Sequence, residues 1–382
     1  MPLSPGHARY DRWCMPPRIL IITASVGAGH DLPAHALGRQ LTEAVPGCEI
    51  HIEDALTYMG PIVSTISHRA PQVVFFRSEW IWDAGFWLFA QFRPTRTASQ
   101  AILHRSGSPG LRRLITRIQP DLILSTWPIA THTLSWMHLR GEITVPVVAS
   151  ITDISALEYW AAPGIDLHLI SYPESEREVR QIAGPATRIA NVVGMTRPEF
   201  LVPRSRTEAR RALGLPEEGA IVLISGGGWG VGDVAGALDA ALRVPDLAMA
   251  VCLCGRNDVL AAELSTRRGH DPHVRIEGFT DQISDYMAAA NALVHSTGGN
   301  TILEAHVRGC TPISYGWGRG HIRLHNRAFR RFGIADVVIT PDELVGAIMR
   351  AIASPRTPDT SFAELPTAAS CILELLPHTA TA

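Results

Sequence analysis

The chain has 382 residues, of which 46% are hydrophobic and 18% charged, and its formal net charge is −2. At roughly 150 residues per domain, this length predicts two domains of an ordinary globular protein, and the near-neutral charge argues against a nucleic-acid partner. The sequence contains no lysine, which excludes a phosphate-binding P-loop lysine, a Schiff-base lysine and a kinase-type lysine.

The first half alternates short apolar runs with helical patterns. Strands are expected at 18–24, 48–55, 121–127, 145–153, 167–172 and 188–194. A helical pattern follows SVGAGH (25–30) and continues to about Val45. Strands that alternate with helices predict a parallel sheet with both faces covered.

Residues 57–93 depart from this alternation, because PQVVFFRSEWIWDAGFWLFAQF (71–92) concentrates Phe and Trp. We favour the interpretation that this segment is a pair of core-packing helices. The alternative is an amphipathic aromatic surface that contacts a membrane or an apolar acceptor.

The second half repeats the pattern, with strands expected at 220–228, 247–255, 274–279, 292–299, 310–316 and 335–340. The Pro- and Arg-rich segment TRPEFLVPRSR (196–206) marks the join, so the predicted domains are 1–198 and 199–382. Near the end of the chain, CILELL (371–376) predicts a short last helix, a candidate to pack back on the N-terminal domain.

The cysteines indicate neither a zinc site nor a disulfide framework, because no CxxC pairs with another. They are interpreted as reduced thiols of a cytoplasmic protein: Cys14, Cys48, Cys252, Cys254, Cys310 and Cys371. Residues 1–18 lack an apolar core, so no signal peptide is expected, and no stretch approaches the ~20 apolar residues of a membrane span.

A glycine loop follows the first strand of each half. Glycine allows backbone N–H groups to approach a phosphate, and a helix N-terminus adds a favourable dipole. His30 comes directly after the first loop, at the sheet edge where open α/β sheets bind ligands, and could act as a general base. A capping or merely exposed histidine is the alternative.

The second half offers two phosphate cradles, ISGGGWGVGD (224–233) and HSTGGNTILEA (295–305). In the latter, small residues end a strand, a helix begins, and Glu304 lies one turn into that helix. Its carboxylate could accept hydrogen bonds from two ribose hydroxyls, or it could complete a capping box.

Eight segments carry a family resemblance, and they occur in family order over most of the chain: SVGAGH (25–30), PDLILSTWP (120–128), ITDISALEYW (151–160), VVGMTRPEF (192–200), SGGGWG (225–230), VCLCGRN (251–257), EGFTDQISDYMAAANALV (277–294) and STGGNTILEA (296–305). With them the chain resembles the GT-B glycosyltransferases. The nearest group holds plant and bacterial diacylglycerol glycosyltransferases, such as monogalactosyldiacylglycerol synthase, and the N-acetylglucosaminyltransferase that completes the peptidoglycan lipid precursor.

The resemblance implies two Rossmann-like domains that face a cleft, with the acceptor on the N-terminal domain and a nucleotide sugar on the C-terminal domain. It implies that His30 is the catalytic base, with Gly27, Gly29, Trp127 and Asp153 on the acceptor side. The donor residues that it implies are Ser225, Gly226, Gly227, Gly228, Arg256, Phe279, Gly298, Gly299, Asn300, Thr301, Glu304, His321 and Asn326.

The sequence departs from the family at two places. The family histidine in TDxxxHxxW is replaced by Leu157, which bears on the acceptor and on the arrangement of the base. The donor-sugar segment reads GWGRGHIRLHN (316–326) where the family has a PGQExxN-like motif, which bears on the identity of the sugar.

The predicted reaction is one in-line displacement that moves a hexose or N-acetylhexosamine from a UDP-sugar to a hydroxyl of a lipid or secondary-metabolite acceptor, with inversion. UDP-sugar is a co-substrate, no other cofactor is expected, and the lack of a DxD carboxylate pair predicts no metal. A cytoplasmic location with peripheral contact at the inner membrane face fits a lipid acceptor. Two alternatives remain open: a nucleotide-sugar 2-epimerase, and a silent nucleotide-sugar-binding partner subunit.

Overall fold

The computed structural model describes residues 16–25, 28–65, 93–155, 157–193, 195–296, 298–316, 318 and 321–376, without the side chains of Ala28, Ile62, Arg93, Arg96 and His321. The aromatic segment 71–92 therefore lies outside the described residues. The chain divides into two compact units. Unit 1 comprises Met1–Arg197 and Leu365–Ala382, and unit 2 comprises Pro198–Glu364.

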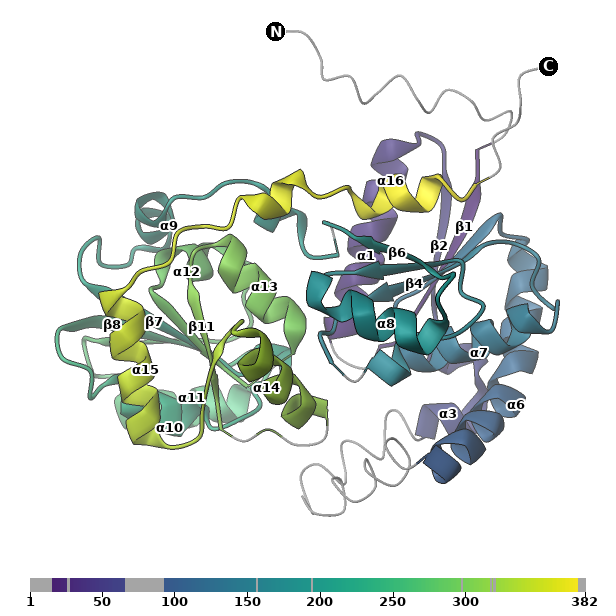
Figure 1. Cartoon of the computed structure of the whole chain (residues 1–382). Coiled ribbons are helices and arrows are strands. Elements are labelled where there is room, and N and C mark those ends of the chain that lie inside the picture. Colours follow the sequence, from purple (N-terminus) through teal and green to yellow (C-terminus); the bar gives the residue numbers. More distant parts are fainter. Residues whose placement is uncertain are drawn as a thin grey trace, which may run out of the picture. The chain divides into compact units, whose positions relative to one another are not determined.

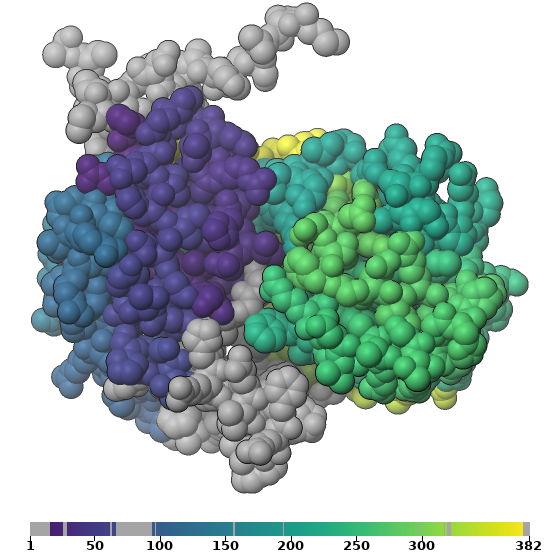
Figure 2. All heavy atoms as spheres, turned by 180° about the vertical axis from the view of Figure 1, so that it is seen from behind, coloured from purple at the N-terminus to yellow at the C-terminus, as the bar shows by residue number. Residues whose placement is uncertain are grey.

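Unit 1 is built on a parallel sheet of six strands in the order β2-β1-β3-β4-β5-β6. Each strand coincides with an apolar run of the sequence: β1 (Arg18–Thr23), β2 (Glu49–Asp54), β3 (Leu122–Ser125), β4 (Val147–Ile151), β5 (Leu167–Ile170) and β6 (Arg188–Asn191). The inner strands are buried on both faces, which explains why they read as continuous apolar runs rather than alternating ones. The edge strand β2 is half-exposed, and the purple segment that contains it lies at the surface in Figure 2.

Helices cover both faces of this sheet (Figure 1). The helices of unit 1 are α1 (Ala28–Ala44), α2 (Ala55–Tyr58), α3 (Gly60–Ser64), α6 (Arg93–Ile118), α7 (Pro128–Leu139), α8 (Glu176–Ala183) and α16 (Ala368–Leu373), with short 3-10 turns η4 (Leu157–Tyr159) and η5 (Pro173–Ser175). Ile19 and Ile21 of β1 pack with α1 and α16. Leu20 and Ile22 pack on the opposite side with α6 and α7.

The end of the chain belongs to unit 1. Val193 and Thr367 form a parallel bridge, and Ile372 and Leu373 of α16 pack with Leu37 of α1 in one core. The last helix covers residues 368–373, three residues earlier than the apolar run CILELL suggests, because Thr367 caps it by accepting a hydrogen bond from the Ser370 N–H.

Unit 2 has a second parallel sheet of six strands, in the order β12-β11-β10-β7-β8-β9. Its strands also follow the apolar runs of the sequence: β7 (Ala220–Ser225), β8 (Leu247–Leu253), β9 (Val274–Glu277), β10 (Ala292–His295), β11 (Thr311–Tyr315) and β12 (Asp336–Val338). The prediction of two parallel-sheet α/β domains is confirmed.

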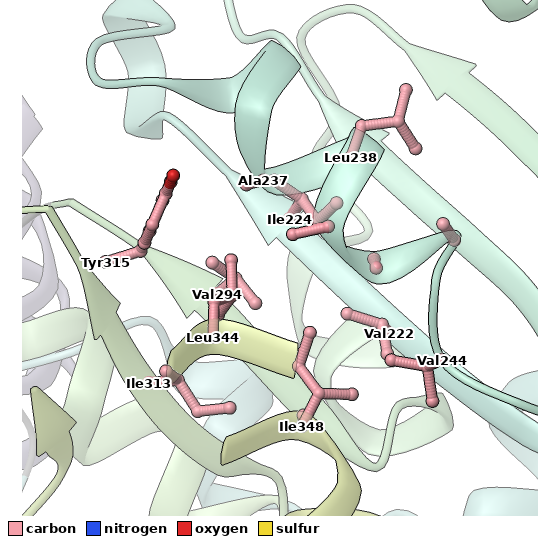
Figure 3. Close-up of a cluster of buried hydrophobic side chains, with 14 of the residues drawn as sticks. Val222, Ile224, Ala237, Leu238, Val244, Val294, Ile313, Tyr315, Leu344 and Ile348 are labelled. Atoms are coloured by element: carbon pink, nitrogen blue, oxygen red, sulfur yellow. The ribbon is translucent and has the colours of Figure 1, made fainter. Parts of the chain in front are cut away.

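The helices of unit 2 are α9 (Arg206–Leu213), α10 (Val234–Ala241), α11 (Asp258–Arg268), α12 (Ile283–Ala289), α13 (Gly299–Val307), α14 (His321–Phe332) and α15 (Pro341–Ala353), with 3-10 turns η6 (Pro198–Leu201), η7 (Gly227–Trp229) and η8 (Ser361–Glu364). Figure 3 shows Val222 and Ile224 of β7 beside Leu238 of α10 and Leu344 of α15, on one face of the sheet. Leu213, Met287 and Ala305 come from α9, α12 and α13 and form the core on the other face.

Candidate active site

In unit 1, hydroxyl side chains form a row at the carboxyl end of the sheet. Ile22 of β1 pairs with Ser125 of β3, so the next residues, Thr23 and Thr126, lie side by side. Ser125 pairs with Ala149 of β4, which continues the row to Ser150. Because side chains alternate along a strand, this row lies on the face that α1 covers. The first turn of α1 carries His30 to this edge.

His30 is held by the backbone of β3. Its Nδ1 lies 3.1 Å from the carbonyl oxygen of Thr126. A carbonyl oxygen only accepts, so Nδ1 carries the proton, and the neutral ring keeps the lone pair of Nε2 for a proton from elsewhere. Burial lowers the pKa of His30 below the ordinary 6.5, and the negative charge of Asp153 partly offsets this. His30 is therefore neutral and held in one orientation at pH 7, as a general base at this edge would need to be.

A tryptophan connects Asp153 to His30. The indole N–H of Trp160 donates to Oδ2 of Asp153 over 3.1 Å. The rings of Trp160 and His30 have centroids 5.4 Å apart and are tilted by 37°. Asp153 was predicted from the sequence as a site residue and Trp160 was not, although Trp160 ends the ITDISALEYW motif that carried the resemblance.

Leu157 is fully buried and belongs to the core. It lies in η4 and packs with Ile151, Trp160 and Val179. The residue that replaces the family histidine therefore stabilises the segment that presents Trp160, and it supplies no titratable group to the site.

The remaining acceptor-side residues fall in different places. Gly27 lies outside the described residues. Gly29 has no atom within 4 Å of the position that a Cβ would take, so space alone does not require a glycine there. Trp127 is 4% exposed and packs with α6 and α7, which corrects the expectation that it faces an acceptor.

In unit 2, the loop after β7 contains positions where close packing or backbone conformation favours glycine. A Cβ on Gly226 would lie 2.6 Å from the carbonyl carbon of Gly230. Gly227 has φ of +68°, a left-handed conformation that favours glycine, and its N–H donates to the Ser225 hydroxyl over 3.2 Å. Gly228 has open space around its Cβ position.

The two glycine loops of unit 2 lie side by side. Ser225 of β7 pairs with His295 of β10, so both loops leave the same edge of the sheet. A Cβ on Gly232, which has φ of +92°, would lie 2.5 Å from Oγ of Ser296. The two loops that were predicted to be phosphate cradles are therefore neighbours within unit 2.

The helix after the second loop has a glycine as its N-cap residue. Gly298 is the N-cap residue of α13 and offers no side chain to the first-turn N–H groups of Gly299, Asn300 and Thr301. Such a helix start can bind an anion. Glu304 is half-buried and lies six residues after the cap, beyond the third helical position of a capping box. The capping interpretation of Glu304 is excluded.

Arg256 follows β8 and Phe279 follows β9, so both residues lie at the same edge of the sheet as the two glycine loops. The guanidinium carbon of Arg256 lies 4.5 Å from the ring centroid of Phe279, which is 47% exposed. The Arg256 N–H donates to the Gly228 carbonyl over 3.0 Å. Trp229, on the glycine loop itself, is 56% exposed. Trp229 was not predicted as a site residue, because its only signal in the sequence is a large aromatic residue among glycines.

Asn326 corrects an expectation, because it is fully buried and does not face a donor sugar. It accepts a hydrogen bond from the Ser314 hydroxyl over 2.7 Å and donates to the Gly316 carbonyl over 3.4 Å. These two hydrogen bonds connect α14 to the end of β11. His321 begins α14, and its side chain is outside the described part of the structure.

Within the described ranges, no group of three or more His, Cys, Asp or Glu side chains could hold a metal ion. No helix in the same ranges is long and apolar enough to cross a membrane. The thiols of Cys254 and Cys310 are buried, and burial raises their pKa to about 11 and about 12, so they are unreactive at neutral pH.

Comparison with known proteins shows what the chain resembles. Residues 30–196 match the family model of monogalactosyldiacylglycerol (MGDG) synthase. Monogalactosyldiacylglycerol synthase 1 of Arabidopsis thaliana is 29% identical over 326 residues, which cover 79% of this chain and 58% of the plant protein. The chain thus spans somewhat more than half the length of that relative.

A processive diacylglycerol beta-glucosyltransferase of Bacillus cytotoxicus is 24% identical over 303 residues, covering 76% of this chain and 74% of the bacterial protein. Among solved structures, MurG of Acinetobacter baumannii superposes with a TM-score of 0.56 at 15% identity, covering 94% of this chain and 99% of MurG. The predicted resemblance is confirmed, and the chain has the GT-B fold.

Proposed function

We propose that this chain, a GT-B protein that resembles the MGDG synthases, is a glycosyltransferase that moves a hexose or N-acetylhexosamine from a UDP-sugar to a lipid hydroxyl. The observation that carries the proposal is the fixed tautomer of His30, with Nδ1 on the Thr126 carbonyl. The names of the two relatives favour a diacylglycerol-like lipid as acceptor.

Unit 1 supplies the base. Nε2 of His30 takes the proton of the acceptor hydroxyl while that oxygen attacks the anomeric carbon. Burial keeps His30 neutral, and Asp153 stabilises the imidazolium that forms. The ring of Trp160 packs on His30 and restricts its orientation.

Unit 2 supplies the donor site. The backbone N–H groups of the glycine loop and of the α13 start would hold the diphosphate, and Glu304 would accept from the ribose hydroxyls. Phe279 and Arg256 would contact the nucleobase of the donor. The bond from the anomeric carbon to the diphosphate oxygen breaks as the new C–O bond forms, and UDP leaves with the electron pair. One displacement inverts the anomeric centre.

Backbone dipoles and the α13 start can neutralise the leaving diphosphate without a metal ion. The proposal therefore includes activity in the presence of a chelator. Two arginines of other parts of unit 2, Arg206 and Arg210, already hydrogen-bond backbone carbonyls and are not part of this site.

The test uses purified protein, EDTA, a panel of nucleotide sugars and diacylglycerol dispersed in detergent. His30→Gln is expected to reduce turnover by at least about a hundredfold while donor affinity changes less than about threefold. His35→Gln is the matched control, because His35 lies on the same helix, is exposed and has its Nε2 4.0 Å from Asp31. Unchanged turnover in the His30 variant, or no binding of any nucleotide sugar, would refute the proposal.

A further inference from the structure

A pocket in unit 1 lies between α2 and α6, and His30 is not among its lining residues. Its volume is about 300 Å³, and it is lined by Thr57, Tyr58, Gly110, Arg113, Leu114 and Arg117. Gly110 brings the two helices together, because a Cβ there would lie 1.7 Å from the Tyr58 carbonyl oxygen. The backbones of α2 and α6 are therefore in close contact beside the two arginines.

The charge of α6 is unusually one-sided. Its 26 residues include six arginines and no Asp or Glu. Arg112 is paired with Glu142, at 2.5 Å. Arg117 is paired with Glu53, at 3.3 Å, and also donates to the Tyr58 hydroxyl. Within the described ranges, Arg113 has no carboxylate partner.

Arg113 and Arg117 stand one turn apart, so their side chains lie on the same face of α6 and repel each other. Glu53 offsets only one of the two charges. An oxyanion between the two guanidinium groups would remove the repulsion and accept several charge-assisted hydrogen bonds. The hydroxyl of Thr57 adds a neutral donor at the pocket rim.

We propose that the Arg113–Arg117 pocket binds a phosphate group, carried either by a phospholipid headgroup or by a free phosphorylated metabolite. Guanidinium pairs match the geometry of phosphate oxygens, and the pocket has room for one such group with its attached ester. This site is independent of the donor and acceptor sites proposed above.

The experiment measures binding of inorganic phosphate and glycerol 3-phosphate by calorimetry, and co-sedimentation with phosphatidylcholine vesicles with and without phosphatidic acid. Arg113→Gln is expected to weaken binding about tenfold or more, and Arg117→Gln similarly. Arg112→Gln is the matched control, since it removes the same charge from the neighbouring position on the same helix. Thermal melting confirms that each variant is folded.

One supporting result is saturable binding of the free phosphates that is weakened by Arg113→Gln and unchanged by Arg112→Gln. This result would identify a metabolite as the source of the phosphate. The same variant pattern seen only with phosphatidic acid vesicles supports the proposal with a lipid as source. No binding in either arm overturns it. Equal losses in Arg112→Gln and Arg113→Gln also overturn it, because diffuse attraction to α6 would then suffice.

Discussion

Nδ1 of His30 lies 3.1 Å from the carbonyl oxygen of Thr126, and this contact decides which nitrogen of the ring can take a proton. The histidine is on α1 and the carbonyl is at the end of β3, 96 residues later. The tautomer is thus set by the pairing of β1 with β3, which brings the two segments to the same edge of the sheet.

The pH dependence of activity should report on His30. Its pKa lies below 6.5, so kcat/KM should stay level through neutral pH and fall only below that value, as the ring becomes protonated. Asp153→Asn removes a charge that raises this pKa, so the acidic limb should move to lower pH. The asparagine can still accept from Trp160. A pH–rate profile whose limb moves to higher pH contradicts this account.

Restoring the family histidine should harm the protein. Leu157→His places an imidazole among Ile151, Trp160 and Val179 in a fully buried position. We expect it to lower the free energy of unfolding by about 2–4 kcal/mol and to bring no gain in turnover. Urea denaturation measures the loss, with Leu157→Met as the volume-matched control. Increased turnover in the histidine variant would show that the site can use a second base.

The glycine loop offers a matched pair of substitutions. Gly226→Ala places a Cβ against Gly230 and should reduce both stability, by about 1–3 kcal/mol, and donor affinity. Gly228→Ala meets open space, so its melting temperature should match the wild type. If backbone N–H groups of this loop hold the diphosphate, Gly228→Ala should still weaken donor binding. Normal donor binding in that variant would place the phosphates elsewhere.

Substitution of Asn326 is expected to lower the stability of the protein rather than to affect donor binding directly. Asn326→Ala leaves the Ser314 hydroxyl and the Gly316 carbonyl without their partner, at a cost of about 1–3 kcal/mol. A double-mutant cycle with Ser314→Ala should give a coupling energy of about 1 kcal/mol. A raised donor KM with unchanged stability would instead mean that Asn326 touches the sugar.

His168 should make unit 1 sensitive to acid. Burial lowers its pKa to about 4, while the unfolded chain binds the proton near pH 6.5. Between these values the unfolded state holds more protons, so stability falls as pH falls, by roughly 3 kcal/mol in total. His168→Gln should flatten this dependence in urea titrations from pH 7 to 4. An unchanged slope would assign the acid sensitivity to other groups.

The strands and both glycine loops were predictable, because apolar runs and glycines are local signals. Asp153 and Arg256 came from the family resemblance. The roles of Trp127 and Asn326 could not be predicted, since a motif gives the position of a residue and not the direction in which its side chain points. Trp160 and Trp229 were missed for the same reason. Trp160 contacts His30 only in the folded chain, and the exposure of Trp229 is likewise a property of the fold.

The packing of α16 against α1 has a consequence for how the chain is made. Unit 2 is one continuous stretch, whereas unit 1 needs Ala368, Ile372 and Leu373 to complete the core beside Leu37. A ribosome finishes every residue of unit 2 before it reaches α16. The half that carries His30 therefore begins first and is completed last, and a chain cut short after unit 2 leaves that half with an open core.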